Sequence, residues 1–218
     1  MASLGRHGSS AIANDRRFFH PPDVVQVSDG AQTFLAVAIA SGNRAAPLKT
    51  TTTNWLYVLM DKDNQTLPIQ PADLKDFSSV CTGGNCPSLL DPNLGLDPDA
   101  KIWKGWKAKL ATAPGEKALS SPVTLNGDLV FTSYVPPNPS AATCTPQQGV
   151  GRLYAVDLAT GAAGAGRSQR STAISPPGIA ATAQYVGTNT FIVSKDILLE
   201  INSQLIWPTW WRKRNAAP

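Results

Sequence analysis

The sequence has little charge and few residues that bind metals or transfer protons. Only 16% of its 218 residues are Asp, Glu, Lys or Arg, whereas about 25% is usual for a globular domain. It contains two histidines and three cysteines. No apolar run reaches about 18 residues, so no transmembrane helix is expected. The net charge of +4 comes from scattered residues. A basic stripe interleaved with aromatics is missing, which argues against nucleic-acid binding.

The beginning of the chain lacks the apolar core of a secretory signal peptide. Residues 1–14 are rich in Ser, Gly and Ala and are predicted to form a flexible leader, while residues 213–218 are predicted to form a tail. Two alternatives follow: the chain is cytosolic, or the start of the native protein lies further upstream.

The cysteines do not follow a metal-binding pattern. Cys81 and Cys86 flank Thr-Gly-Gly-Asn, a spacing that differs from CxxC, and His7 and His20 lie far along the chain. Because two glycines let the loop ends approach, a local Cys81–Cys86 disulfide is predicted, with a pair of inert thiols as the alternative. Cys144 is left over, either free or paired with a cysteine outside this chain.

Glycine and proline are abundant, with 17 and 18 copies, which is typical of an all-β protein with many turns. Asp29-Gly30 and Asn126-Gly127 each separate two apolar segments and predict β-hairpins. The predicted strands cover 23–27, 33–40, 54–60, 121–125, 129–134, 152–158, 181–186, 191–193 and 197–201.

Two segments interrupt this pattern. Residues 67–100 are predicted to be an insertion of loop and short helix, because Pro71 and the acids that follow it favour one or two helical turns before Ser79. The rest of the insertion has weak periodicity. Residues 161–171 are rich in Gly, Ala and Ser and predict an exposed, flexible loop.

A weak internal repeat favours a β-propeller. LYVLMD at 56–61 and LYAVDL at 153–158 are similar, and each follows two predicted strands joined by a turn. Propeller blades recur at about 40–45 residues. The predicted fold class is therefore all-β, a partial β-propeller of roughly three or four blades, and its lateral faces are expected to make the isolated chain self-associating or marginally stable.

An ordered series of segments carries a family resemblance. The segments are RFFHPPDV (17–24), FLAVAIASGNR (34–44), PL (47–48), LYVLMDKD (56–63), GEKALSSPV (115–123), NG (126–127), VFTSY (130–134), CTP (144–146), GRLYAVD (151–157) and WR (211–212). Together they resemble the C-terminal β-propeller of PilC/PilY-type type IV pilus biogenesis proteins, which are pilus-tip adhesins. The resemblance covers roughly residues 15–212.

The resemblance implies an exported protein of the periplasm, outer membrane and cell surface, placed at the pilus tip of Gram-negative bacteria. Its implied activities are pilus assembly, adhesion and twitching motility, without catalysis. The implied partners are minor pilins and a host or abiotic surface.

The sequence departs from the family at its calcium loop. Asp61 and Asp63 occupy the first and third positions of such a loop, but Gln65 stands at the fifth and no Gly at the sixth. Residues 97–99 (Asp-Pro-Asp) do not match the pattern of a calcium loop either. No cofactor or metal is therefore expected in this chain. The variable N-terminal half of the family has no counterpart either.

No catalytic constellation stands out. His20 lies between Phe19 and Pro21 and is interpreted as a local structural residue. Ser120-Ser121 lacks the G-x-S-x-G elbow. Glu116 and Asp128 could form a carboxylate pair, but turn capping and solvation explain them better. The glycine-rich residues 161–166 lack the Lys-Ser/Thr of a phosphate loop.

The six tryptophans allow a sugar-binding platform, but burial between blades is the favoured interpretation. They include Trp103 and Trp106, and the terminal group Trp207, Trp210 and Trp211.

Two alternatives stay open for the whole chain. Residues 154–161 (YAVDLATG) also resemble the blade signature of pyrroloquinoline-quinone dehydrogenases, which hold their cofactor inside a complete propeller. The other alternative is a truncated paralogue without a function of its own.

Overall fold

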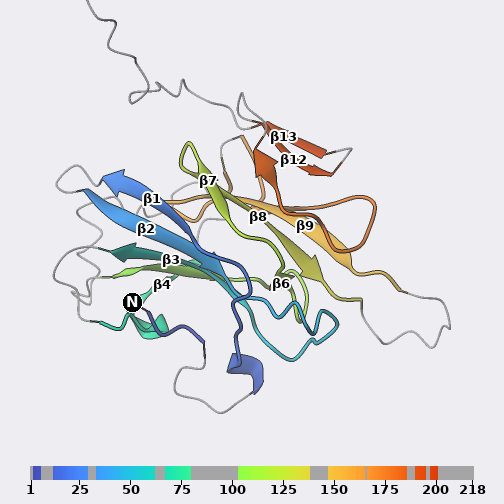
Figure 1. The fold of residues 1–218 in the computed structure, drawn as a ribbon, viewed down its shortest axis with the longest axis horizontal. Coiled ribbons are helices and arrows are strands. Elements are labelled where there is room, and N and C mark those ends of the chain that lie inside the picture. Colours follow the sequence, from blue (N-terminus) through green and yellow to red (C-terminus); the bar gives the residue numbers. More distant parts are fainter. Residues whose placement is uncertain are drawn as a thin grey trace, which may run out of the picture.

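The structure of the chain is a computed structural model. It describes residues 2–5, 12–28, 33–61, 67–79, 103–137, 147–164, 166–185, 190–194 and 197–200. Within these ranges the regular structure is almost entirely β, with two short 3-10 helices, η1 (Ile12–Asn14) and η2 (Pro71–Asp73) (Figure 1).

The first sheet is an antiparallel meander with one short parallel strand at its edge. Strand β2 buries alternate residues from Phe34 to Ala40, the period-two pattern of a strand with one face in a core. In the order β1-β2-β3-β5-β4, the strands are β1 (Asp23–Ser28), β2 (Thr33–Ala40), β3 (Trp55–Asp61), β5 (Gly105–Lys109) and β4 (Lys75–Asp76).

The second sheet follows the same plan. Its strands are β6 (Lys117–Ala118), β7 (Val123–Leu125), β8 (Asp128–Val135), β9 (Val150–Asp157) and β10 (Ser171–Ala173). Both β6 and β7 pair with β8, at different points along it, so together they act as one interrupted strand. Asn126 and Gly127 join β7 to β8 with φ angles of 52° and 85°, the double positive φ of the tight hairpin turn that the Asn-Gly pair predicted.

A third sheet consists of β11 (Gln184–Tyr185), β12 (Thr190–Ser194) and β13 (Ile197–Glu200), again antiparallel. It lies beyond the second sheet, in orange and red in Figure 1.

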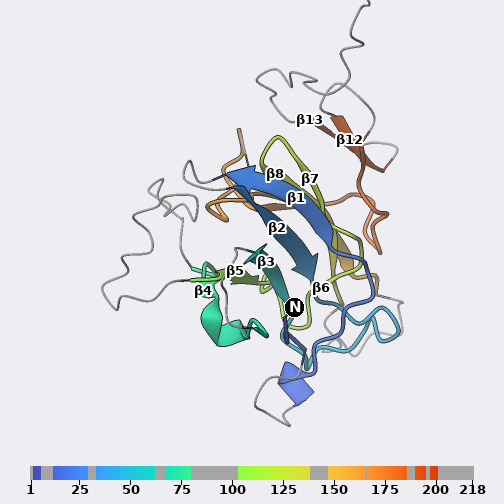
Figure 2. The ribbon, with the colours of Figure 1, turned by 60° about the vertical axis from the view of Figure 1, so that its left-hand side comes forward.

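Buried apolar residues form one cluster between sheets and one on each outer side. The first cluster packs the first sheet against the second, through Val58, Trp106 and Phe131 among others. The second lies on the opposite face of the second sheet and includes Ile174 and Ala183, which lead to the third sheet. The third lies on the opposite face of the first sheet, whose strands β1 to β5 are labelled in Figure 2.

This arrangement is all-β and consistent with a partial β-propeller, as the sequence predicted. The repeated hexamers lie in β3 and β9, the third strand positions of the first two sheets. The two sheets also touch through β1 and β7, since Asp23 on β1 accepts a hydrogen bond of 2.6 Å from the Thr124 N–H on β7. The predicted boundaries of the propeller portion at 15–212 stay predictions.

The insertion differs from its prediction in the part that the structure describes. The helix covers only Pro71–Asp73, and the chain then forms β4, which joins the first sheet. Lys75 and Asp76 pair with β5 because the Phe77 side chain is fully buried and draws this segment onto the sheet. The predicted cysteine loop lies outside the described residues.

Two segments expected to be flexible make ordered contacts. In the predicted leader, Leu4 is buried and the Ser3 N–H donates to the Ile69 carbonyl. In the predicted exposed loop 161–171, Gly161 and Gly164 are buried, and the Gly164 N–H donates to the Ala155 carbonyl. These two glycines pack closely, whereas Gly166, Ser168 and Gln169 are exposed, so the predicted exposure is confirmed for only part of this loop.

Candidate functional site

The interface between the first and second sheets depends on a tryptophan from β5. Trp106 is fully buried, and its ring stacks on Phe77 with 5.7 Å between ring centroids. Its indole Nε1–H donates a 2.8 Å hydrogen bond to the carbonyl of Leu158, just after β9. One side chain thus supplies both an apolar contact and a hydrogen bond across the interface. For Trp106, this confirms the predicted burial between blades.

The turn that receives Trp106 is held by Asp157. Its Oδ1 atom accepts hydrogen bonds from the Ala159 N–H, the Thr160 N–H and the Thr160 hydroxyl, at 3.0, 2.7 and 2.7 Å. Gly161 follows with φ +63°, where a Cβ atom would lie 2.9 Å from the Phe77 ring. The dehydrogenase-like signature therefore has a local packing function in this chain.

Glu116 is a charged residue of the interface and has no exposed surface. Its Oε1 accepts from the Ser133 hydroxyl at 2.6 Å and from the Tyr154 hydroxyl at 2.8 Å. Its Oε2 accepts from the Thr112 N–H at 2.7 Å. Its backbone carbonyl accepts from the Asn54 amide. The carboxylate thereby joins the loop after β5 to strands β8 and β9.

Tyr154 completes this network. Its ring stacks on Phe131 with centroids 4.8 Å apart. Burial raises the pKa of the Tyr154 phenol, and the nearby charge of Glu116 raises this pKa further. Tyr154 therefore stays a neutral donor to Glu116 throughout the ordinary pH range.

Lys117 points its ammonium group into a different set of contacts. The residue is only 2% exposed, and its Nζ donates to the carbonyls of Ala46, Pro47 and Lys49 at 3.4, 2.5 and 2.8 Å. Burial, and then the charge of Lys49, lower the pKa of Lys117 to about 8. Lys117 fastens the loop between β2 and β3 to the start of the second sheet.

An open cleft of about 430 Å³ lies at the outer rim of this interface, and we call it the inter-sheet cleft. The first sheet and its neighbouring segments contribute Ser78 and Lys109. The rest of the lining comes from the loop after β5, from β9, from the segment between β9 and β10, and from the first residue of β10. The full lining is Ser78, Lys109, Ala111, Thr112, Tyr154, Ala163, Ser168, Gln169, Arg170 and Ser171.

The carboxylates singled out in the sequence do not come together. Asp128 lies at the start of β8, five residues from Ser133, so about 16 Å of strand separates it from the Glu116 network. The expectation that both are solvated is wrong, because Glu116 and Asp128 are both buried. Turn capping is confirmed for Glu116 by its bond from the Thr112 N–H.

Other candidates of the sequence have local contacts. Ser120 is buried, and its hydroxyl oxygen accepts from the Thr132 N–H at 2.8 Å. Burial and the charge of Arg44 lower the pKa of His20. Asp61 ends β3, whereas residues 62–66 lie outside the described ranges, as do Asp97 and Asp99. Also outside them are Cys81, Cys86, Cys144, Trp207, Trp210 and Trp211.

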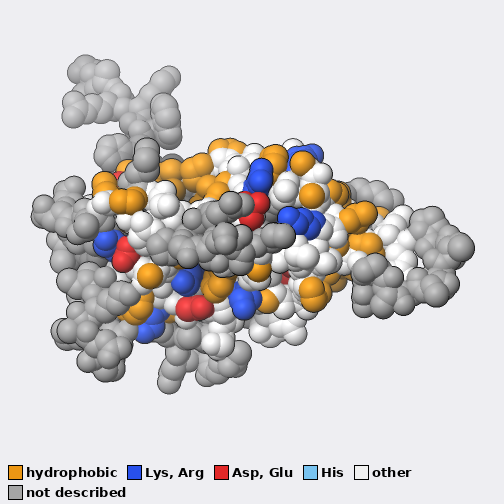
Figure 3. Space-filling view, turned by 90° about the horizontal axis from the view of Figure 1, so that it is seen from below, with side chains coloured by type: hydrophobic (Ala, Val, Ile, Leu, Met, Phe, Trp, Pro, Cys, Tyr) orange, Lys and Arg blue, Asp and Glu red, His pale blue; other side chains and the backbone are white. Residues whose placement is uncertain are grey.

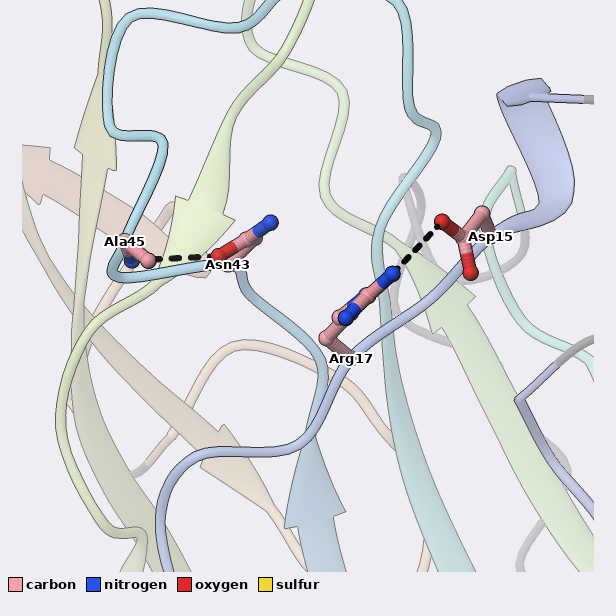
Figure 4. Close-up of polar contacts among 4 residues, drawn as sticks. All are labelled: Asp15, Arg17, Asn43 and Ala45. Atoms are coloured by element: carbon pink, nitrogen blue, oxygen red, sulfur yellow. Dashed lines mark hydrogen bonds and ion pairs between the residues drawn. The ribbon is translucent and has the colours of Figure 1, made fainter.

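Two segments of the family resemblance lie against each other. The Gly42 N–H donates to the Arg17 carbonyl at 2.8 Å. Figure 4 shows the side chains nearby: Arg17 pairs with Asp15 at 3.2 Å, and Asn43 accepts from the Ala45 N–H at 3.0 Å. These polar residues fix the turns at one end of the first sheet.

A local feature of the sequence indicates that the adjacent charges Glu116 and Lys117 are buried. The two charges lie between Gly115 and the apolar residues Ala118 and Leu119, and the structure buries all of residues 115–120. Two charged residues inside such a segment indicate buried side chains whose polar atoms are hydrogen-bonded within the protein. Its partners could not be named, because Ser133, Tyr154 and the 46–49 carbonyls are distant in sequence.

The described residues contain no group of three or more His, Cys, Asp or Glu side chains placed to hold a metal ion. Among the same residues, no helix has the length and apolar character needed to cross a membrane. On the face drawn in Figure 3, Lys and Arg side chains lie among Asp and Glu side chains.

Comparison with known proteins gives a structural likeness only. No protein-family model matches the sequence, and no curated protein matches it. A solved structure, the C-terminal domain of Pseudomonas aeruginosa PilY1, is similar with a TM-score of 0.58 and 14% sequence identity. The similarity covers 91% of this chain and 47% of that one, so the chain spans about half the length of the solved domain. The chain therefore has a PilY1-like fold.

Proposed function

We propose that this chain is part of a type IV pilus biogenesis protein and acts by binding other proteins and surfaces at the pilus tip. The observation that carries the proposal is the shared fold, which extends over 91% of the chain. The ordered segments that resemble PilC/PilY-type proteins support it from the sequence. The proposed place of action is the cell surface, after export, and the proposed partners are minor pilins and a host or abiotic surface.

We also propose that the chain binds without catalysing a reaction. In the inter-sheet interface, the Glu116 oxygens accept hydrogen bonds from Ser133, Tyr154 and Thr112, and Ser120 is bound to the Thr132 backbone. These groups stabilise packing. Addition of pyrroloquinoline quinone with calcium is expected to give no bound chromophore and no dehydrogenase activity. A stoichiometric chromophore would overturn this part.

Deletion of the gene in the source bacterium tests the pilus role. The expected result is fewer surface pili, less twitching and weaker adhesion, each restored by the wild-type gene. Complementation with a Trp106→Ala variant is the informative arm, because this change removes the link between the first two sheets. Normal piliation and twitching in the deletion strain would contradict the proposal.

A further inference from the structure

A second, smaller cavity lies at one end of the interface between the first and second sheets, and we call it the end cavity. Its volume is about 140 Å³. The first sheet contributes Val27, Ala36 and Met60, and the second contributes Gly127 of the β7–β8 turn and residues 157–159. The three residues from the first sheet belong to the core cluster between the sheets or pack against it. The end cavity is therefore a gap in that core.

The gap follows from small residues at this end of the interface. Gly127 has no side chain, and Ala36 and Ala159 each have only a methyl group, whereas large aromatic rings fill other parts of the same core cluster. The inner wall is closed, since Ala36 and Met60 are 1% and 3% exposed. Gly127 is exposed, so the cavity reaches solvent at this turn. A small molecule can enter there without separating the sheets.

The backbone polar groups of residues 157 and 158 are engaged within the protein. The N–H and the carbonyl of Asp157 both form backbone hydrogen bonds, at 3.1 and 2.8 Å. The Leu158 N–H donates to the Gly127 carbonyl at 2.7 Å, and the Leu158 carbonyl accepts from the Trp106 indole. An ordered buried water needs about two to four polar partners, and these groups already have theirs. We therefore expect the end cavity to hold water poorly.

Asp157 is the only charged residue among the described residues that line the end cavity, and its side chain lies on another face. Successive residues of a strand point to opposite faces of a sheet. Val156 and Leu158 belong to the core cluster between the sheets, so the carboxylate of Asp157 points away from it. Asp128 pairs with Asp157 and shares that opposite face. On the first sheet, Asp61 ends β3 on the outer face, opposite an exposed leucine of β2.

We propose that the end cavity binds one small apolar molecule, of the size of a single aromatic ring. An apolar cavity of about 150 Å³ in another protein stays dry and binds benzene, so a volume of about 140 Å³ suits one ring. Removal of the ring from water supplies the affinity. The inference goes beyond the proposed pilus function, because it rests on the end cavity alone. Binding by the purified chain and piliation of the cell are separate measurements, so either can fail without the other.

Met60 provides a direct probe of the end cavity, because the sequence contains only two methionines, Met1 and Met60. The whole chain, labelled with ¹³C in its methionine methyl groups, is titrated with toluene and with phenol and followed by NMR. The Met60 signal is expected to shift and saturate with toluene, with the Met1 signal as internal reference. Phenol should bind at least about tenfold more weakly, because its hydroxyl would give up hydrogen bonds to water in an apolar site.

Larger side chains in the lining test the location. Ala36→Leu and Ala159→Leu should each weaken toluene binding at least about tenfold, because they occupy the space of the ring. Ala36 is a buried strand residue, whereas Ala159 is a half-buried turn residue, so Ala159→Leu is the variant expected to fold without disturbing the core. Ala113→Leu is the matched control, since Ala113 is also half-buried outside the strands but does not line the end cavity.

Three results would each overturn the proposal. The first is a Met60 signal that does not saturate with toluene or that responds equally to toluene and phenol. The second is an equal loss of toluene binding in the Ala159→Leu and Ala113→Leu variants. The third is toluene binding of wild-type strength by Ala159→Leu.

Discussion

The two faces of the first sheet differ in how completely they are buried. On the face toward the second sheet, Leu56, Val58 and Met60 are at most 3% exposed. On the opposite face, Val24 on β1 and Leu35 on β2 are 51% and 44% exposed. The outer strands of that face are covered by other segments, with Leu4, Ile69 and Leu74 buried against Tyr57.

This difference shows that a part of the first sheet is buried where another element packs on it and exposed where none does. A blade of a propeller buries both faces only where another element packs on each of them. The interface of the first and second sheets has such a partner, reinforced by the Trp106, Glu116 and Lys117 contacts. The exposed strip at Val24 and Leu35 is the part of the first sheet that remains available for contact.

The largest effect is expected where the buried face is broken. Trp106→Ala removes a fully buried ring and leaves the Leu158 carbonyl without its indole donor. The free energy of unfolding should fall by about 3–5 kcal/mol, measured by urea denaturation. Trp103→Ala is the control, at a partly exposed position, and should cost less than about 2 kcal/mol. Equal losses would contradict the central role of Trp106.

Loss of the carboxylate network should come next. Glu116→Ala leaves the Ser133 and Tyr154 hydroxyls and the Thr112 N–H without their acceptor. We expect a loss of about 2–4 kcal/mol in the free energy of unfolding, because buried unsatisfied donors are costly. Glu116→Gln keeps the shape and one acceptor oxygen, so its loss should be smaller. A Glu116→Ala variant with an unchanged free energy of unfolding would show that these hydrogen bonds do not contribute to stability.

Lys117 should make the free energy of unfolding depend on pH. Its pKa of about 8 in the folded chain lies below the usual 10.5, so between these pH values the unfolded chain holds a proton that the folded chain has released. The free energy of unfolding should therefore rise with pH across this window, and below about pH 8 this contribution should be constant.

Lys117→Met should remove this rise and, at neutral pH, lower stability by about 1–3 kcal/mol, because the 46, 47 and 49 carbonyls lose their donor. The measurement is the difference between wild type and variant in urea titrations from pH 7 to about 10. A constant difference across that range would contradict the assigned pKa.

The smallest effect on stability is expected on the exposed face. Leu35→Gln should change the free energy of unfolding by less than about 0.5 kcal/mol, because the side chain is 44% exposed. It should nevertheless reduce self-association in sedimentation experiments, since it interrupts the exposed apolar strip. A wild-type chain that stays monomeric at all concentrations would contradict the expected self-association through this face.

Local signals predicted most of the fold. The period-two pattern of β2 and the Asn126-Gly127 turn act within a few residues, so the sequence displays them directly. The repeat of β3 and β9 was visible for the same reason. The short β4 was missed, because its pairing depends on contact of Lys75 and Asp76 with a strand that lies about 30 residues further along.

The candidate site was much harder to predict. The inter-sheet cleft brings together Ser78, Thr112, Tyr154 and Arg170 from four separate segments, and no single segment has a recognisable motif. The sequence favours turn capping and solvation for Glu116 and Asp128, because charged side chains usually lie in solvent. The structure instead satisfies Glu116 through Ser133 and Tyr154, whose proximity follows only from the packed sheets.

The most direct test of the pilus assignment is to locate the protein. Surface pili sheared from the source bacterium can be purified and probed with an antibody to this chain, with a strain lacking the major pilin as control. The protein is expected in the pilus fraction of the wild type and should be lost from that fraction in the control strain. Absence from purified pili, with the protein retained inside the cell, would contradict it.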